Sequence, residues 1–207
     1  MCGRYDLSEN PAAIRAKFSV PDVPDFFATV PNVADVRPTD RAPIVRLDRG
    51  GARECTLARW GLVPSWAKDL AFGTRCINAR SETVASTAAF KLAYRKRRLC
   101  LVPVVAFYEW SGPKGKRLKH RITLPEEPLF ALAGLWEWWR DPATPEGPGI
   151  ETYTIITTEA NGAIAPLHDR MPVVLRAAQY DAWLDPARTE EETAAMLRPF
   201  EGELKIA

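Results

Sequence analysis

The second residue of the chain is the first candidate for chemistry, because the sequence begins Met1-Cys2-Gly3-Arg4-Tyr5. A small second side chain permits removal of the initiator Met1, and Cys2 then carries an amine and a thiol on adjacent carbon atoms. The amine condenses with an aldehyde to an imine, and the thiol closes on the imine carbon to give a thiazolidine ring. A free α-amine has a pKa of about 7.7–8.0, so it is largely available near neutral pH. The same thiol could instead attack an acyl group as a thiolate.

Four segments further along the chain combine polar and aromatic side chains. They are WGLVPSW at 60–66, NARSET at 78–83, FYEW at 107–110 and HDRMP at 168–172. Each also has a purely structural interpretation: tryptophans in the core, side-chain caps of a turn, one half of a buried ion pair, and a loop hydrogen bond. The residues by themselves leave both interpretations open.

Two titratable side chains in these segments are suited to proton transfer. Glu109 is flanked by Tyr108 and Trp110, and desolvation by such neighbours would raise the pKa of its carboxyl group towards neutrality. His168 is one of only two histidines, and an imidazole has an ordinary pKa of about 6.5. The pair therefore offers acid and base groups near neutral pH.

The elements that must position these segments are mostly strands. Apolar runs and alternation predict strands over 44–47, 55–60, 121–124, 129–136 and 152–157, and a long β-rich run over 99–110 that Pro103 interrupts. Helices are expected over 11–18, with Asn10 as N-cap and Pro11 in the first position, and over 87–94, 177–184 and 190–197. The Pro-rich stretch 21–43 is expected to be irregular. Many strands with few helices between them predict an antiparallel α+β domain, either barrel-like or a sandwich.

Composition sets the class of protein. With 207 residues, 46% of them hydrophobic and 26% charged, the chain suits one domain with a sizeable core. We expect no transmembrane helix, because no uncharged apolar stretch approaches about 18 residues, and no signal peptide, because the first residues are charged. We therefore expect a soluble intracellular protein that does not associate with membranes. Four cysteines without a CxxC pair, and only two histidines, show no zinc spacing, so free thiols and no metal are expected.

Charge is distributed unevenly along the sequence. Residues 1–121 contain 22 Lys and Arg against 11 Asp and Glu, whereas residues 122–207 contain 6 against 15. The densest basic runs are Lys91–Arg98 and Lys114–Arg121. Such an uneven distribution of charge favours a polyanionic partner on one face of the protein. A solvated helix face and a solvated loop explain the two basic runs equally well.

Together, the N-terminal MCGRY and the four segments resemble the SRAP family, the SOS response-associated peptidases that crosslink to abasic sites. The pieces occur in the family's order between residues 1 and 172, so the resemblance covers most of the chain. It implies an α+β fold, with residues 1–207 as one compact domain on an antiparallel β-barrel-like core with flanking helices. It also implies a positive channel for single-stranded DNA.

The resemblance implies a catalytic role for each of four residues. Cys2, once a thiol autopeptidase activity has removed Met1, would form the thiazolidine with the ring-opened abasic sugar. Asn78 would orient Cys2 and the sugar. Glu109 would be the acid and base near the α-amine, and His168 would assist opening of the sugar ring.

The resemblance implies DNA contacts as well. The matching positions are Arg4, Arg80 and Ser81 for the backbone, Trp66 as a stacking aromatic, Pro38 in a loop, and Thr157 as a phosphate contact. Trp60 and Trp66 would supply aromatic platforms, on which each stacked base contributes about 1–3 kcal/mol. The chain departs from the family pattern at 35–39 (DVRPT), where Pro38 and Thr39 match but Arg37 replaces a small residue.

The expected partner is single-stranded DNA that contains abasic sites. The expected state is a monomer in the cytoplasm that joins the nucleoid when bound to DNA, and no metal, nucleotide, flavin or other cofactor is required.

Three other functions remain as alternatives. Glutamine amidotransferases of the N-terminal cysteine type also begin Met-Cys-Gly, and Asn161-Gly162 resembles part of their pocket, but WGLVPSW, FYEW and HDRMP then have no role. A noncovalent single-strand binding module would be indifferent to Cys2. A papain-like Cys-His-Asn protease has a different chain order, although geometry rather than order decides such a site.

Overall fold

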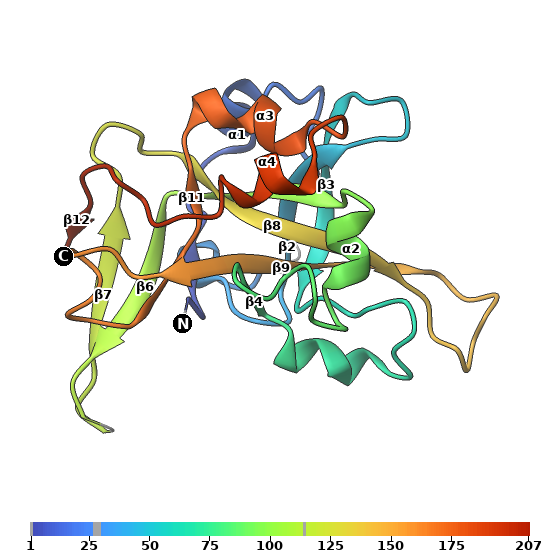
Figure 1. Cartoon of the computed structure of the whole chain (residues 1–207), viewed down its shortest axis with the longest axis horizontal. Helices are drawn as coiled ribbons and strands as arrows, with labels where there is room; N and C mark the ends of the chain where they lie inside the picture. Colours follow the sequence, from blue (N-terminus) through green and yellow to red (C-terminus); the bar gives the residue numbers. More distant parts are fainter. Residues whose placement is uncertain (1, 27–29, 114) are drawn as a thin grey trace.

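Five strands close into a barrel at the centre of the molecule (Figure 1). The computed structural model describes residues 2–26, 30–113 and 115–207. The barrel strands, in the order in which they neighbour one another, are β9 (Ile150–Glu159), β3 (Arg53–Trp60), β2 (Arg41–Leu47), β5 (Leu99–Val104) and β8 (Phe130–Trp139). β8 pairs again with β9, which completes the ring. The barrel-like α+β core expected from the sequence is confirmed.

Three short strands extend this barrel, and two of its pairings are parallel. β10 (Arg170–Pro172) and β4 (Asn78–Arg80) both add to β9, and β11 (Val174–Leu175) adds to β8. β4 and β3 run parallel to β9, whereas the other neighbours are antiparallel. The core is therefore mixed rather than purely antiparallel, because the chain crosses the molecule between β3 and β9 instead of turning back in a hairpin.

A second, antiparallel sheet lies beside the barrel. Its order is β1 (Tyr5–Asp6), β6 (Ala106–Ser111), β7 (Leu118–Thr123) and β12 (Lys205–Ile206). The β-rich run predicted over 99–110 is present, but it breaks at Val105 rather than at Pro103, and its two halves enter different sheets. Pro103 does not interrupt β5, where it lies opposite Ala131. β2 pairs with β5 only at Leu101, so the missing N–H of Pro103 breaks no ladder on that side.

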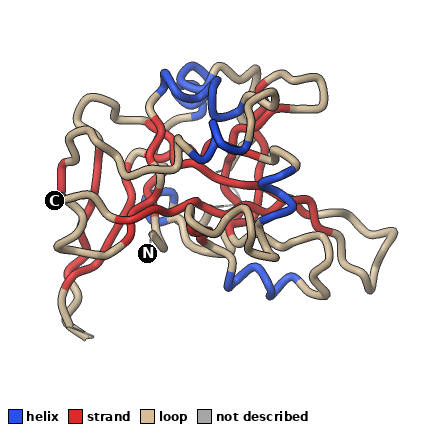
Figure 2. The backbone as a smooth tube through the Cα atoms, in the orientation of Figure 1, coloured by secondary structure: helices blue, strands red, loops and turns tan. Residues whose placement is uncertain are grey.

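Short helices cover the barrel, as Figure 2 shows. They are α1 (Pro11–Phe18), α2 (Lys91–Arg95), α3 (Tyr180–Leu184) and α4 (Glu190–Ala194), with 3-10 turns at Val33–Asp35, Leu70–Arg75 and Ala177–Gln179. The predicted cap of α1 is confirmed, because Asn10 Oδ1 accepts a hydrogen bond from the Ala13 N–H at 2.8 Å. None of the helices in the described ranges has the length and apolar character needed to cross a membrane.

The other predicted helices are shorter than expected. The helix predicted over 87–94 begins only at Lys91, after a series of turns. Ser86 Oγ donates to the Thr83 carbonyl at 3.2 Å, and such local bonds compete with helix formation. The helix predicted over 177–184 is present as a 3-10 turn, Ala177–Gln179, followed directly by α3, and the helix predicted over 190–197 ends early, at Ala194.

The main core fills the barrel and includes large aromatic side chains. Trp60 is fully buried, its ring contacts Tyr5 and Tyr153, and its Nε1 donates to the Ile77 carbonyl at 2.8 Å. The Tyr5 and Tyr153 hydroxyl groups are hydrogen-bonded to each other at 2.7 Å. The prediction that Trp60 offers a platform for DNA bases is therefore wrong, because every face of its ring is occupied by the core.

Gly134 provides a test of barrel closure. It lies in β8 between β5 and β9, where a Cβ atom would approach Cys100 Sγ to 2.8 Å and the Thr154 carbonyl oxygen to 2.9 Å. We expect Gly134→Ala to lower the free energy of unfolding by about 1–3 kcal/mol, as overpacking usually does. Gly162→Ala is the control, because a Cβ there meets nothing within 4 Å, and should change stability by less than about 0.5 kcal/mol. Urea denaturation measures both, and equal stabilities would contradict the tight closure.

Candidate functional site

Cys2 is held at the site by the pairing of β1 with β6. Tyr5 lies opposite Phe107 in this antiparallel pair, and the Tyr108 N–H donates to the Arg4 carbonyl at 3.1 Å. The residues that precede β1 therefore run beside the following residues of β6. The Cys2 side chain is fully buried, and its Sγ donates to the Arg4 carbonyl at 3.7 Å. Met1, whose removal is predicted, lies outside the described residues.

Asn78 contacts Cys2 from the barrel side. It is the first residue of β4, which runs parallel to β9 with Asn78 opposite Ile155. Asn78 Nδ2 donates to the Cys2 carbonyl at 2.8 Å. Within the described ranges, the buried Asn78 Oδ1 has no hydrogen-bond partner. Because a buried acceptor without a partner is costly, this oxygen is poised to accept from a group that arrives beside Cys2.

Glu109 supplies a carboxyl group with an unusual proton affinity. Its side chain is only 2% exposed, and burial, together with the charge of Asp169, raises its pKa from 4.5 to about 7. Burial and the charge of Glu109 in turn raise the pKa of the Cys2 thiol. The carboxyl group can therefore take or give a proton near neutral pH, while the thiol keeps its proton.

A cavity of about 360 Å³ connects Glu109 with His168. The other lining residues are Trp110, Ser111, Gly112, Arg117, Pro166 and Leu167. Arg117 was not predicted, and its place in a long basic run gave no signal that it would face this cavity. The cavity brings the FYEW and HDRMP segments together across a space that a small sugar-sized group can enter.

The surroundings of His168 determine which ring nitrogen carries a proton. The Arg170 N–H donates to His168 Nδ1 at 2.9 Å, so the neutral ring carries its proton on Nε2. Partial burial lowers the pKa of His168 and favours this neutral form. Asp169 Oδ1 lies 2.8 Å from the same Nδ1 and would pair with the ring when it is protonated.

An ion pair joins the NARSET and HDRMP segments. Arg170 Nη1 and Nη2 bind Glu82 Oε1 and Oε2 at 2.6 and 2.9 Å, and Nη2 also donates to the Thr157 carbonyl at 2.7 Å. This bidentate geometry fixes orientation as well as distance, and it lowers the pKa of Glu82. Sequence reasoning assigned neither residue, although opposite charges in two motif segments were the available signal.

Thr157 does not lie where a phosphate could reach it. Its side chain is fully buried, and its Oγ1 donates to the Ala79 carbonyl at 3.4 Å. Its backbone carbonyl accepts from the Ser81 N–H at 2.8 Å. The structure thus contradicts the predicted phosphate contact, because in this register the Thr157 side chain turns into the barrel, and assigns the residue to support of β4.

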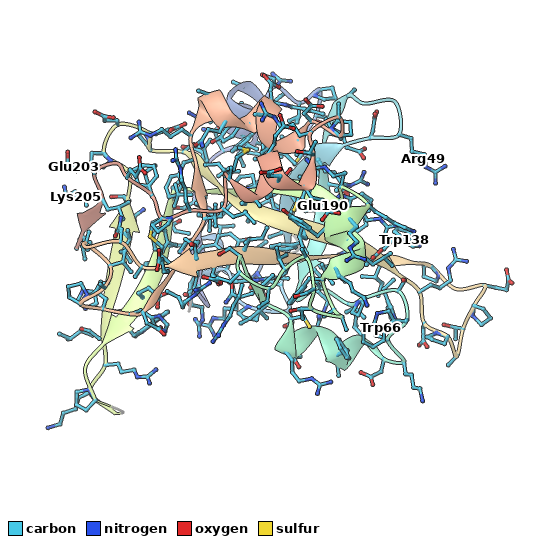
Figure 3. All side chains as sticks on the ribbon, in the orientation of Figure 1. Arg49, Trp66, Trp138, Glu190, Glu203 and Lys205 are labelled. Atoms are coloured by element: carbon cyan, nitrogen blue, oxygen red, sulfur yellow. The ribbon has the colours of Figure 1, made fainter. Side chains whose placement is uncertain are left out.

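The other predicted DNA contacts lie at or near the surface. Arg80 is exposed at the end of β4, two residues after Asn78 and therefore on the same face of the strand. Pro38 is half-buried in the loop before β2. Trp66 is 53% exposed, and its ring meets only the edge of Phe72, at a centroid distance of 5.1 Å. Figure 3 shows Trp66 projecting outward on the lower side of the view.

No metal site accompanies this arrangement in the part of the chain that the structure describes. No three His, Cys, Asp or Glu side chains are grouped there as ligands. The four cysteines are free thiols, and all except Cys55 are buried. The groups that the structure places at the site are a thiol, a carboxyl group, an imidazole and a side-chain amide.

Comparisons with known proteins show what the whole chain is similar to. A model of the SOS response-associated peptidase (SRAP) family matches residues 1–207. The chain is 35% identical over 206 residues to the abasic site processing protein YoqW of Bacillus subtilis, covering 98% of this chain and 89% of that protein. It is 32% identical over 168 residues to the abasic site processing protein HMCES of Gallus gallus, covering 69% of this chain and 49% of HMCES.

Solved structures share the fold. A protein from Bacteroides thetaiotaomicron superposes with a TM-score of 0.88 at 25% identity, covering 99% of this chain and 90% of that one. A protein from Bordetella bronchiseptica superposes with a TM-score of 0.81 at 26% identity, covering 100% and 98%.

The raised pKa of Glu109 predicts how stability depends on pH. The folded protein holds this proton up to about pH 7, whereas an unfolded carboxyl group loses it near 4.5. Glu109 therefore does not lower the free energy of unfolding below pH 4.5, and it lowers that free energy progressively as the pH rises from 4.5 to about 7. Glu109→Gln cannot ionise, so we expect it to gain on the order of 1–3 kcal/mol relative to wild type between pH 5 and pH 8. Urea denaturation at both pH values measures the difference, and parallel behaviour of the two proteins would contradict the raised pKa.

Proposed function

Because the chain belongs to the SOS response-associated peptidase family, we propose that it captures abasic sites in single-stranded DNA as a covalent thiazolidine on Cys2, after hydrolysis of the Met1–Cys2 peptide bond. Its relatives YoqW and HMCES are named abasic site processing proteins. The observation that carries the proposal is the contact of the Cys2 carbonyl with Asn78 beside a carboxyl group that titrates at about pH 7.

The proposed reaction uses both groups of the N-terminal cysteine. The Cys2 amine attacks the aldehyde carbon of the opened sugar, and loss of one water leaves an imine. Sγ then adds to the imine carbon while the thiol proton passes to the nitrogen. The sum is an aldehyde and an aminothiol giving a thiazolidine and water. Closing the ring removes the imine that would otherwise promote β-elimination and strand cleavage.

Glu109 and Asn78 serve the Cys2 end of this reaction. Glu109 takes a proton from the amine before the attack and returns one to the departing hydroxyl group, which requires a pKa near the working pH. Asn78 fixes the Cys2 carbonyl through Nδ2, and its unpartnered Oδ1 accepts from the amine or from a sugar hydroxyl. Sγ gives up its proton as it adds, and the same proton is taken up by the imine nitrogen, so ring closure needs no proton from outside the site.

His168 serves the sugar end. An abasic sugar is mostly a closed ring and must open to expose its aldehyde. In its protonated form, His168 gives the Nε2 proton to the ring oxygen, the bond from that oxygen to the anomeric carbon breaks, and the hydroxyl proton leaves to solvent. Asp169, 2.8 Å from Nδ1, stabilises the protonated ring.

The proposed DNA surface consists of exposed and half-buried side chains. Arg80 and Arg4 would contact phosphates, Ser81 and Pro38 would line the strand, and Trp66 would stack on a base. Single-stranded DNA fits because an unpaired sugar can turn into the cavity without the cost of unstacking a duplex.

The motif segments disfavour the amidotransferase alternative, because WGLVPSW, FYEW and HDRMP have no role in it. Release of ammonia from glutamine would revive that alternative.

The decisive experiment is a denaturing gel with abasic single-stranded DNA. We expect a stable adduct with wild type, little with duplex or undamaged DNA, and none with Cys2→Ala. Cys2→Ser is the matched control, because it keeps a free amine and loses the thiol: it should give an adduct only when borohydride reduces the imine. An equal stable adduct from Cys2→Ala would contradict the proposal. Salt-sensitive binding that ignores both Cys2 and the lesion would favour a noncovalent binding module instead.

A second experiment separates Glu109 from His168. Glu109→Gln should slow both removal of Met1, where that removal is autocatalytic, and adduct formation, because both steps involve the Cys2 amine. His168→Ala should leave Met1 removal intact and slow only the DNA step. General acid–base groups contribute about 10²–10⁴-fold, so each loss should be large but incomplete. Intact mass reports Met1 and single-turnover crosslinking reports the DNA step. If the His168→Ala variant kept Met1 while the Glu109→Gln variant lost Met1 normally, the roles assigned to His168 and Glu109 would have to be exchanged.

A further inference from the structure

Three basic side chains converge on one carboxylate next to the Cys2 site. Arg4 Nη1 lies 2.7 Å from Asp35 Oδ2, Arg37 Nη2 lies 2.8 Å from the same oxygen, and Lys119 Nζ lies 3.3 Å from Oδ1. We call these four residues the Asp35 cluster. They come from three separate parts of the chain, so only the fold brings them together.

The Asp35 cluster carries a net positive charge that faces outward. Three cations surround one anion, and the Asp35 side chain is only 13% exposed, whereas those of Arg4, Lys119 and Arg37 are 31, 41 and 58% exposed. Burial alone would disfavour ionisation of Asp35, but the Arg37 hydrogen bond and the charges of Arg4 and Lys119 lower its pKa below the ordinary value. The carboxylate is therefore charged, and it holds the three cations at its solvent side without neutralising them.

Tyr108 fixes the position of the cluster relative to the reactive end of the chain. Lys119 Nζ lies 3.7 Å from the centre of the Tyr108 ring, and the Tyr108 hydroxyl donates to the Ala34 carbonyl at 2.9 Å. Tyr108 precedes Glu109 in β6, and Arg4 is two residues from Cys2. Because successive side chains of a strand point to opposite faces, the Tyr108 ring and Lys119 lie on the face of the β6–β7 sheet opposite to the Glu109 side chain. The cluster is therefore close to the Cys2 end of the chain through Arg4, and a strand of DNA would reach it outside the cavity that Glu109 lines.

Two further carboxylates lie near the cluster, and no ion pair between described residues joins either of them to Arg4, Arg37 or Lys119. Asp40 Oδ2 accepts from the Arg37 backbone N–H at 2.8 Å. The next basic side chain of β7, Arg121, binds Asp6 instead, at 2.9 Å. Arg37 binds Asp35 through Nε and Nη2, and Arg4 does so through Nη1, so each guanidinium keeps at least one N–H group that no described residue occupies. One cation is enough to balance the charge of one carboxylate in a structural ion pair. The Asp35 cluster contains two cations more than that, and these are left for an external anion.

We propose that Arg37 and Lys119, held with Arg4 around Asp35, form a phosphate subsite that binds a backbone phosphodiester of the strand flanking the captured nucleotide. The inference rests on the proposed function, because it takes single-stranded DNA as the ligand. It also gives a role to Arg37, which replaces a small residue of the family pattern. The subsite adds affinity and fixes the path of the strand, and it takes no part in bond formation.

Noncovalent binding tests the subsite without the covalent step. In a Cys2→Ala background, the affinity for a short undamaged oligothymidylate is measured by anisotropy at several salt concentrations. We expect Arg37→Gln and Lys119→Gln each to weaken binding and to reduce the slope of log affinity against log salt by about 0.7, the value for one phosphate contact with a single strand. In the double variant, the slope of log affinity against log salt should fall by about 1.4. Arg37→Lys and Lys119→Arg keep the charge and should retain most of the wild-type slope.

Arg49→Gln is the matched control. Arg49 is exposed in the turn between β2 and β3, and Figure 3 shows it at the opposite side of the molecule from the sheet that carries Lys119. Its loss removes one positive charge and should leave the slope within error of wild type. Thermal unfolding of every variant confirms that the proteins are folded when binding is measured.

The outcomes separate the subsite from the function on which it rests. A double variant with the same slope as the Cys2→Ala parent, when the Cys2-intact protein crosslinks abasic DNA normally, would overturn the subsite alone. An equal loss of slope from Arg49→Gln would also overturn it, because the effect would then reflect net charge rather than place. A Cys2-intact protein that forms no adduct with abasic DNA would contradict the proposed function, whatever the salt slopes show.

Discussion

The two residue pairs that join β1 to β6 hold the reactive end of the chain in place. A chain terminus has one covalent neighbour and ordinarily frays. Here Tyr5 packs on Trp60 and bonds to Tyr153 inside the barrel, while backbone hydrogen bonds tie Arg4 to Tyr108. Those contacts bury the Cys2 side chain and bring it within the field of Glu109. The geometry of the site therefore depends on packing several residues away from the reactive atoms.

Burial then determines the proton chemistry. The desolvation that raises the pKa of Glu109 to about 7 also raises that of the Cys2 thiol. A site designed around a thiolate would instead surround sulfur with positive charge, but the cations here pair with Asp35 and Glu82. In the proposed reaction the amine is therefore the first nucleophile, and Sγ adds second and gives up its proton as it does so.

Strand β9 is the common support of the remaining groups. β4 and β10 pair with it on its edges, and Arg170 bonds both to Glu82 and to the Thr157 carbonyl of β9. Asn78 and His168 are far apart in the sequence, but each is positioned by a short strand that pairs with β9. The bidentate ion pair between Arg170 and Glu82 opposes motion of the segment after β4 relative to β10. The barrel thereby maintains the distance between Cys2 and His168.

The sequence by itself determined the family, the strand-rich class and the candidate residues, because a 1,2-aminothiol, a carboxyl group between aromatic residues and five ordered motifs are properties of residue type and order. The cap of α1 followed in the same way from Asn10 and Pro11. Trp60, Thr157 and the break in the 99–110 run were misjudged because side-chain direction and strand breaks depend on which neighbours a strand acquires. Local pattern cannot distinguish a tryptophan in the core from one at the surface, since both occur in similar turns. The Asp35 cluster and the Arg170–Glu82 pair were decided by the tertiary structure. Apart from the local Arg37–Asp35 contact, they join residues 31 to 88 positions apart, and such contacts exist only once the sheets have brought those residues together.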